Sequence, residues 1–437
     1  MKMEALNHAI EDARSRYVSA NPLSQEANEK AMRYLPGGNT RSVLHYHPYP
    51  LTMVGGDGAE LTDLDGHRYV DFVGEYSAAL FGHSNEVIKA AVHAALDGGV
   101  AMGAPTSYER ELAGLLCERF PSLDQLRFCN SGTEANLMAL STACVVTGRK
   151  KLLAFRDGYH GGVIKFLGGV CALNVPYDFV LADYNDIDGT ASLIDEVGDA
   201  LAGVIIEPIL GAGGNIQGNR QFLEMLRRKT EEIGALLIFD EVKTARLGPA
   251  GIQGMLDFKP DLTTLGKFIG GGLPTGAFGG SAEVMAHFDP RRQGALAHAG
   301  TFNNNVCSMA AGCAAMREIY TPERAAEFFD RSESFRLSLN EMFAAKAVPM
   351  YANGMGSMIA LHFSREPTKR PSDITAGCRS LRPLLHMELL LDGVLCCGRG
   401  DMFLSLPMDD RQLAQAVTAL EKFADQHKPL IEQVLAA

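Results

Sequence analysis

The chain has no excess of positive charge and no apolar run long enough to cross a membrane. Its 437 residues carry 40 Lys and Arg against 52 Asp and Glu, a formal net charge of -12. Nucleic-acid binding depends on clustered Lys and Arg that release counterions, so this balance argues against a nucleic-acid partner. No apolar stretch approaches the roughly 20 residues that span a bilayer, which argues against a membrane role. Small molecules are the favoured partner class.

The cysteines follow neither a disulfide framework nor the spacing of a zinc site, so no metal is expected. They are odd in number and scattered, at positions 117, 129, 144, 171, 307, 313, 378, 396 and 397. Residues 1–22 combine acidic groups with a helical apolar spacing (Leu6, Ile10, Ala13, Tyr17) instead of a basic region followed by an apolar core. No secretory signal is therefore expected, and a cytoplasmic location fits best.

Short apolar runs alternate with helical patterns from about residue 85 onward, which is typical of a parallel sheet with helices on both faces. The runs at residues 125–128, 151–155, 203–206 and 235–239 are continuously apolar, as expected of strands buried on both sides. Before this region, residues 50–75 read as short strands with a hairpin signal at Asp65-Gly66. After residue 320 the pattern changes to charged helices, a few strands and an amphipathic terminal helix from Asp409. The fold class is therefore predicted to be α/β with two domains.

Lys267 lies between an apolar run and a glycine-rich loop, downstream of Asp240 at the end of another apolar run. An ammonium among apolar residues loses solvation, which lowers its pKa and leaves more of the nucleophilic amine. Such an amine can form a Schiff base. Asp240 could supply the fixed negative charge that a pyridinium nitrogen requires. Taken singly, a solvated lysine and a strand-ending aspartate are the simpler interpretation.

A second strand ends in a turn of small polar residues, Asn130-Ser131-Gly132-Thr133-Glu134, before a helical pattern. Free backbone N–H groups and the helix dipole at such a point can hold a phosphate. The same residues are also an ordinary helix N-cap, and both interpretations stay open.

Two further strand ends carry candidate site residues. Tyr159 stands between glycines and could stack on a planar ring or anchor a turn. Glu207 closes an apolar strand and could act in a site or simply end the strand. Since ligands bind at the carboxyl ends of parallel strands, these side chains are expected at one edge of the sheet.

Six motifs in order resemble the class III pyridoxal-phosphate aminotransferases, from about residue 30 to about residue 420. They are Asn130-Ser-Gly-Thr-Glu-Ala, Gly158-Tyr-His-Gly, Glu207-Pro, Phe239-Asp-Glu-Val, Gly266-Lys267 and Gly300-Thr-Phe-Asn-Asn-Asn. The resemblance implies fold type I, with a mostly parallel sheet in a large domain and a smaller α+β domain formed by both termini. Residues 76–320 would form the large cofactor-binding domain, and residues 1–75 and 321–437 the small one.

The resemblance also implies pyridoxal 5'-phosphate as cofactor and a role for each candidate. Lys267 would form the Schiff base and move the substrate proton, and Asp240 would keep the ring nitrogen protonated. The remaining cofactor-binding residues would be Ser131, Gly132 and Thr133 at the phosphate, Tyr159 and Val242 on the ring faces, Glu207 nearby, and Thr301 at the phosphate of a neighbouring subunit. Because Thr301 would reach the cofactor of a neighbouring subunit, the resemblance also implies a homodimer with shared active sites.

The segment Leu35-Pro-Gly-Gly-Asn-Thr-Arg41-Ser-Val resembles glutamate-1-semialdehyde aminomutases and β-amino-acid aminotransferases of the β-phenylalanine type. Asn39-Thr40-Arg41 and Asn303-Asn-Asn305 favour the second group. The resemblance then implies that Arg41 holds the substrate carboxylate and that Arg399 binds the α-carboxylate of the keto acid. Val43 and Tyr76 are the other expected substrate-binding residues. Guanidinium groups suit this task because they bind carboxylates in a bidentate manner.

The predicted activity is the transfer of an amino group to a keto acid, such as 2-oxoglutarate or pyruvate, by a ping-pong mechanism. The predicted donor is an aromatic β-amino acid or a related amine. An intramolecular aminomutase and a non-catalytic protein that binds the cofactor are the alternatives. Lys243 departs from the resemblance, because relatives more often carry an uncharged residue there. We expect its side chain to be solvated, since alternate strand positions point away from one another.

Overall fold

The computed structural model describes residues 2–436 and contains a central seven-stranded sheet of order β4-β12-β11-β10-β7-β5-β6. All neighbouring pairs among β11, β10, β7, β5 and β6 are parallel, and β12 runs antiparallel to both β11 and β4. The α/β class with a mostly parallel sheet is confirmed. The strands are β4 (Gln125–Cys129), β5 (Lys151–Phe155), β6 (Asp178–Ala182), β7 (Leu201–Ile206), β10 (Leu236–Asp240), β11 (Leu262–Gly266) and β12 (Gly276–Gly280).

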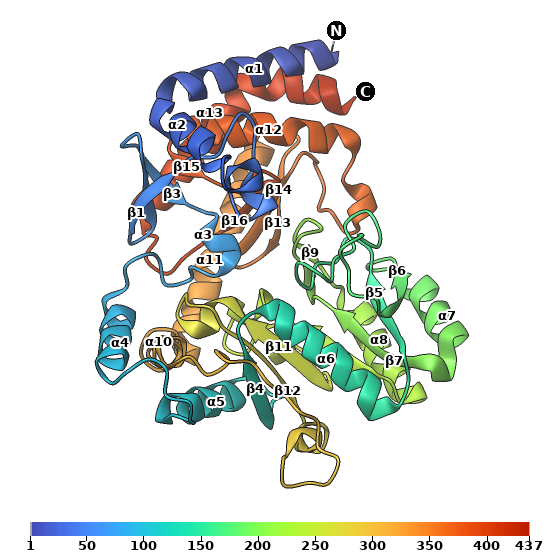
Figure 1. Ribbon diagram of the computed structural model, residues 1–437. Coiled ribbons are helices and arrows are strands. Elements are labelled where there is room, and N and C mark those ends of the chain that lie inside the picture. The colour runs from blue at the N-terminus through green and yellow to red at the C-terminus, as the bar shows by residue number, and fades with distance from the viewer. Residues whose placement is uncertain (1, 437) are drawn as a thin grey trace.

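Helices cover both faces of this sheet (Figure 1). One face packs against α6 (Gly132–Thr147), and the other packs against α8 (Arg220–Ile233), beside which lies α7 (Ile187–Val197). Within β10, Ile238 belongs to the core on the α6 side, whereas Leu237 and Phe239 belong to the core on the α8 side. Successive side chains of a strand point to opposite faces, so a strand between two helical layers must be apolar at every position.

The two ends of the chain pack together at one end of the molecule (Figure 1). Helix α1 (Lys2–Ala20) lies against α12 (Ala376–Leu391) and α13 (Asp410–Leu435), and it buries the four predicted residues, Leu6, Ile10, Ala13 and Tyr17. A four-stranded sheet joins the N-terminal strands β1 (Met53–Asp57), β2 (Glu60–Asp63) and β3 (Arg68–Asp71) to β15 (Val394–Leu395). The predicted hairpin at Asp65-Gly66 connects β2 and β3.

The rest of the C-terminal part holds a three-stranded sheet and a long helix. The strands are β13 (Tyr351–Met355), β14 (Met358–His362) and β16 (Asp401–Phe403), and one continuous helix, α11 (Pro322–Ala345), replaces the separate helices suggested by the charge pattern. The domain boundaries at residues 75 and 320 stay predictions. The remaining elements are α2 (Pro22–Ala31), α3 (Gly74–Ser77), α4 (Glu86–Asp97), α5 (Ser107–Arg119), α9 (Ala282–Met285), α10 (Val306–Ala314), β8 (Ile209–Leu210) and β9 (Ile216–Gln217).

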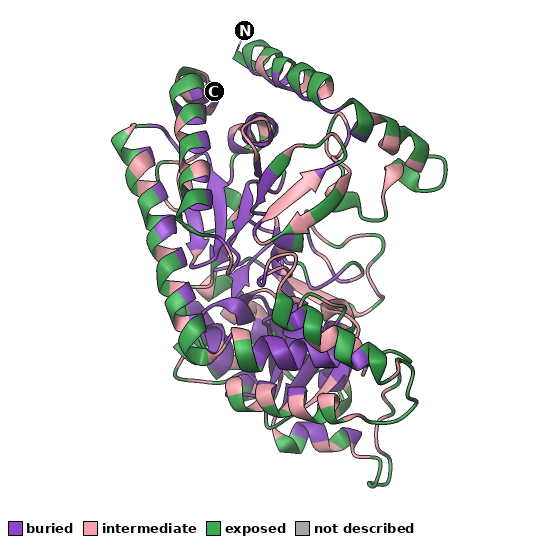
Figure 2. Ribbon diagram, turned by 90° about the vertical axis from the view of Figure 1, so that its left-hand side faces the viewer, coloured by how far each residue is buried: buried purple, intermediate pink, exposed green. Residues whose placement is uncertain are grey.

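Burial follows this layering, with buried strands between helices that expose their outer faces (Figure 2). No helix within residues 2–436 is long and apolar enough to cross a membrane. Because β4, β7 and β10 point the same way, their carboxyl ends meet at one edge. That edge carries Asn130, Glu207 and Asp240.

Candidate active site

Asp240 ends β10 with a buried carboxylate that accepts three hydrogen bonds. Asn136 Nδ2 and His160 Nδ1 each lie 2.8 Å from its Oδ2, and the backbone N–H of Val242 donates to Oδ1 at 3.0 Å. An ionised carboxylate only accepts hydrogen bonds, so the histidine nitrogen is the donor here. Thr264, on the neighbouring strand β11, donates its hydroxyl to Asn136 Oδ1 at 2.6 Å. The position of Asp240 is thus fixed from three sides.

Neither Asn136 nor His160 was among the predicted site residues, although both contact Asp240. A signal existed for Asn136, because it is an amide that interrupts the apolar residues of 135–140 in α6. A buried polar side chain of that kind needs a partner, which here is Asp240. The burial of His160 was harder to predict from the sequence, since its neighbours are the glycines and the tyrosine of a loop.

Lys267 follows β11 directly and has a left-handed backbone, with a φ of 57°. Burial lowers the pKa of its ammonium to about 7, and the positive charge of Lys243 contributes to the same effect. Burial, the cause that the sequence suggested, thus lowers the pKa of this amine, and its role as a Schiff-base former stays a prediction. Behind the lysine, Gly271 approaches α10 so closely that a Cβ there would lie 2.8 Å from the carbonyl oxygen of Ala311.

The turn before α6 lies next to Lys267. A Cβ at Gly266 would lie 3.4 Å from the backbone nitrogen of Gly132, and a Cβ at Gly132 would lie 2.7 Å from Val242 Cγ1. Only glycine leaves room for Val242 at this point. Ser131 is the N-cap of α6, and its hydroxyl accepts a hydrogen bond from the N–H of Glu134 at 3.2 Å. The capping arrangement is present, and it leaves the N-terminal end of the helix dipole at this edge.

Tyr159, Thr133 and Glu207 complete this side of the cluster. A Cβ at Gly161 would lie 2.3 Å from Thr133 Oγ1, so the loop that carries Tyr159 touches the start of α6. The N–H of Tyr159 donates to Glu207 Oε1 at 2.9 Å, and the N–H of Gly211 donates to Oε2 at 3.1 Å. Burial raises the pKa of Glu207. Glu207 therefore holds two loops rather than merely ending β7.

The structure brings Arg41, Val43 and Tyr76 together. The hydroxyl of Tyr76 donates to the carbonyl oxygen of Val43 at 2.8 Å, and the guanidinium carbon of Arg41 lies 5.2 Å from the centre of the Tyr76 ring. Arg41 also forms an ion pair with Glu75. Both Glu75 and Tyr76 belong to α3, a single left-handed turn.

Arg399 is close enough to Tyr76 for its charge to act on the hydroxyl. Its Nε forms an ion pair with Asp401 Oδ2 at 2.6 Å. Burial raises the pKa of Tyr76, and the charges of Arg399 and Arg41 oppose that rise. Both arginines therefore act on the same tyrosine, although they come from opposite ends of the chain.

The expectation of a solvated Lys243 is wrong. Its Nζ lies 4.8 Å from the centre of the Phe403 ring, and 2.7 Å from where a Cβ on Gly211 would stand. Burial lowers its pKa. The alternation argument fails because β10 ends at Asp240, and Lys243 already has the helical backbone of a turn. A period of two holds only within a strand.

Thr301 is exposed, and no contact within residues 2–436 joins it to Lys267. Its loop is held to the turn before α6 by Asn303, whose Oδ1 accepts a hydrogen bond from Asn130 Nδ2 at 2.9 Å. Its expected role across a subunit boundary stays a prediction.

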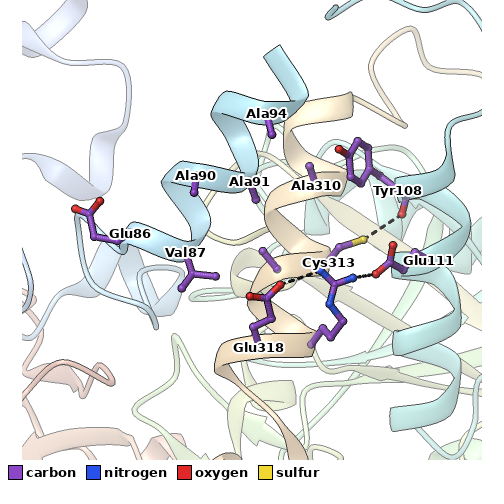
Figure 3. A pocket seen from close by; sticks show the side chains of 12 residues that line it. Glu86, Val87, Ala90, Ala91, Ala94, Tyr108, Glu111, Ala310, Cys313 and Glu318 are labelled. Carbon is purple, nitrogen blue, oxygen red and sulfur yellow. Dashed lines mark hydrogen bonds and ion pairs between the residues drawn. The ribbon is translucent and has the colours of Figure 1, made fainter. Parts of the chain in front are cut away.

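A cavity of about 550 Å³ lies apart from this cluster, between α4, α5 and α10 (Figure 3). Small apolar side chains of α4 and α10 face one another across it. Its one arginine, Arg317, is already paired with Glu111 and Glu318. The cavity shares no lining residue with the site described above.

Comparison with known proteins agrees with this arrangement. The family model for aminotransferase class III matches residues 43–423. This chain belongs to the class III aminotransferases. Enzymes of this class bind pyridoxal 5'-phosphate and transfer amino groups between a donor and a keto acceptor.

Among its relatives in the class, a β-phenylalanine transaminase of Variovorax paradoxus is 46% identical over 431 residues, 99% of each chain. A glutamate-1-semialdehyde 2,1-aminomutase of Bacillus licheniformis is 38% identical over 91% of this chain and 96% of the relative. The crystal structure of a β-phenylalanine aminotransferase from Variovorax paradoxus superposes with a TM-score of 0.95 at 46% identity, covering 97% of this chain and 99% of the other. The fold is that of the fold type I pyridoxal-phosphate enzymes.

The pKa of about 7 makes Lys267 testable in the cofactor-free enzyme. Its acetylation rate, followed by peptide mass spectrometry against pH, should reach half of its plateau near pH 7. Lysines on the exposed surface of the protein serve as the internal control and should titrate near about pH 10. Lys243→Met should shift the Lys267 midpoint upward, because it removes a neighbouring like charge. A Lys267 midpoint at the value of the exposed lysines would contradict the assignment.

Proposed function

We propose that this aminotransferase moves the amino group of an aromatic β-amino acid to 2-oxoglutarate or pyruvate. Its 46% identity to a β-phenylalanine transaminase over nearly the whole chain supports the donor class. The observation that carries the proposal is the pair of arginines near Tyr76: Arg41 lies over its ring, and the charge of Arg399 acts on the same side chain. A transaminase admits two carboxylates in turn, and two guanidinium groups offer each of them a bidentate partner.

The residues at the sheet edge fit pyridoxal 5'-phosphate. The N-terminus of α6, with Ser131, Gly132 and Thr133, offers free N–H groups and a positive dipole end for the phosphate. The buried Asp240 carboxylate would face the ring nitrogen, and Val242 and Tyr159 would lie against the ring faces. The close fit of Gly132 against Val242 supports this, because any larger residue at 132 would displace Val242.

When bound, the cofactor supplies the electron sink that lets a C–H bond next to nitrogen break. In this proposal Lys267 anchors the cofactor, then takes the proton from the substrate carbon and returns it to the cofactor carbon. An amine of pKa about 7 suits both tasks, since general acid–base catalysis is most efficient when the pKa lies near the working pH. Asp240 preserves the protonated ring nitrogen throughout.

Arg41 would hold the distal carboxylate of the β-amino acid, and Val43 and Tyr76 would line the pocket around its side chain. Arg399 would bind the α-carboxylate of the keto acid. Glu75 and Asp401 now pair with these two arginines, so an incoming carboxylate must share or displace them. For the exposed Arg41–Glu75 pair this costs little, because surface ion pairs are worth about 0–1 kcal/mol.

The proposed active form is a homodimer in which Thr301 reaches the phosphate of the partner subunit. The exposed apolar residues Val100, Met102 and Phe302 support it, because Asn304 Nδ2 donates to the carbonyl oxygen of Ala104 and brings their loops together. Sedimentation equilibrium of the holoenzyme should give twice the 47.1 kDa of one chain. A monomer with full activity would contradict the shared site.

An aminomutase that moves an amino group within one molecule is the second candidate, favoured by the 38% identity to such an enzyme. The two activities differ in their need for an acceptor. An aminomutase turns over without an external keto acid, whereas a transaminase stops after one half-reaction.

A half-reaction screen tests the proposed function. The purified holoenzyme should show the absorption of lysine-bound cofactor at about 410 to 420 nm, and a β-amino acid should bleach this band in a single turnover. Addition of 2-oxoglutarate or pyruvate should restore it. Restoration without any keto acid would favour the aminomutase, and bleaching by α-amino acids alone would contradict the donor class.

Arg41→Ala should raise the KM for an aromatic β-amino acid by about 10- to 100-fold, the loss expected for a charged hydrogen-bonded contact of about 1.5–3 kcal/mol. The KM for an aryl amine without a carboxylate should change little, because it never uses the guanidinium. The matched control is Arg228→Ala, which removes an exposed arginine paired with Glu232 on α8. Equal effects on both donors would remove Arg41 from the carboxylate site.

A further inference from the structure

Lys243 is a cation in the substrate region to which the proposed function gives no task. Its ammonium lies against the Phe403 ring and next to Gly211, so its side chain points from the end of β10 toward β16. Arg399, Asp401 and Glu207 all act on its charge, which places it in the corner that holds the acceptor arginine.

The three cations of this region differ in their partners. Arg41 is paired with Glu75 and Arg399 with Asp401, whereas the ammonium of Lys243 forms no hydrogen bond or ion pair with any of residues 2–436. Burying a charge without a partner is costly, so such a group usually has a role that requires it.

The neighbouring carboxylates are only partly available to Lys243. Both oxygens of Glu207 accept backbone N–H groups, and Oδ2 of Asp401 is bound to Arg399. Oδ1 of Asp401 is buried without a hydrogen bond and can compete for the Lys243 ammonium. An ammonium has three donors, so even a contact with this oxygen would leave N–H groups for a further anion.

We propose that Lys243 is a specificity residue that binds the second carboxylate of a dicarboxylic keto acid while Arg399 holds the first. It favours 2-oxoglutarate over pyruvate, which has no second carboxylate. The inference rests on the proposed function, since it concerns the acceptor of that same site. Lys243 does not itself carry the proton. Its effect on the pKa of Lys267 is the same for both acceptors, whereas its contact with the second carboxylate acts only when 2-oxoglutarate binds in the second half-reaction.

The test uses holoenzyme converted to its amino form by a donor and then freed of that donor. For Lys243→Met, the ratio of kcat/KM for 2-oxoglutarate to that for pyruvate should fall by about tenfold or more, the loss of one good charged contact. Lys243→Arg should keep most of the ratio. Lys229→Met, which removes a lysine from an ion pair with Asp195 on the outer surface, is the control and should leave the ratio unchanged.

A binding measurement gives a second readout that needs no turnover. The resting holoenzyme should bind glutarate more tightly than butyrate, and Lys243→Met should abolish the difference. Equal losses with both acceptors would overturn the inference and leave Lys243 as a counter-charge for Asp401. An unchanged ratio would overturn it as well.

Failure of the proposed function remains distinguishable from failure of this inference. If β-amino acids do not convert the wild-type enzyme, the donor assignment fails. The glutarate and butyrate comparison then still decides the role of Lys243.

Discussion

The candidate site depends on one buried carboxylate, that of Asp240. An isolated charge in an apolar interior is so unfavourable that it must be surrounded by donors, and those donors come from three separate parts of the chain. Asn136 brings α6 with it, His160 brings the loop of Tyr159, and Thr264 supports Asn136 from β11. Because Lys267 lies three residues beyond Thr264, the contacts of Asp240 also fix the position of the Lys267 amine relative to the start of α6 and the loop of Tyr159.

Around this fixed centre, the two arginines near Tyr76 differ in how firmly their partners hold them. Arg41 pairs with Glu75, and both side chains are exposed. Such a surface pair contributes about 0–1 kcal/mol, so a ligand carboxylate could replace Glu75 with little loss. Arg399 pairs with Asp401, whose carboxylate is buried, and leaving a buried carboxylate without its partner is costly. Under the proposed function, a carboxylate at Arg399 would therefore share the guanidinium with Asp401.

The features that could be predicted from the sequence are those set by residues close together in the chain. The apolar spacing of residues 6–17 predicted the buried face of α1, and short, mostly apolar runs predicted β4, β5, β7 and β10. Burial of Lys267 followed from its neighbours in the chain. Contacts between distant segments were beyond such reasoning, as with Glu75 on Arg41 or His160 on Asp240. The antiparallel β12, rich in glycine, gave no apolar run to detect.

Lys243 shows how one misplaced boundary changes a conclusion. Extending β10 by three residues would turn its side chain outward, whereas the observed turn directs it inward. The alternation of side chains therefore predicts their direction only for residues within the strand, which here ends at Asp240. Element boundaries are set by tertiary contacts such as the Val242 N–H bond to Asp240, and these leave little trace in a single sequence.

The turn at α3 has a consequence for which residues can stand beside Arg41. Glu75, Tyr76 and Ser77 have φ values of 47°, 53° and 79°, a conformation that costs a residue with a side chain roughly 1–2 kcal/mol. β-Branched residues tolerate this backbone least, whereas glycine adopts it without that cost. The contact of the Tyr76 ring with Arg41 therefore depends on a turn that is held against its own backbone preference by the surrounding fold.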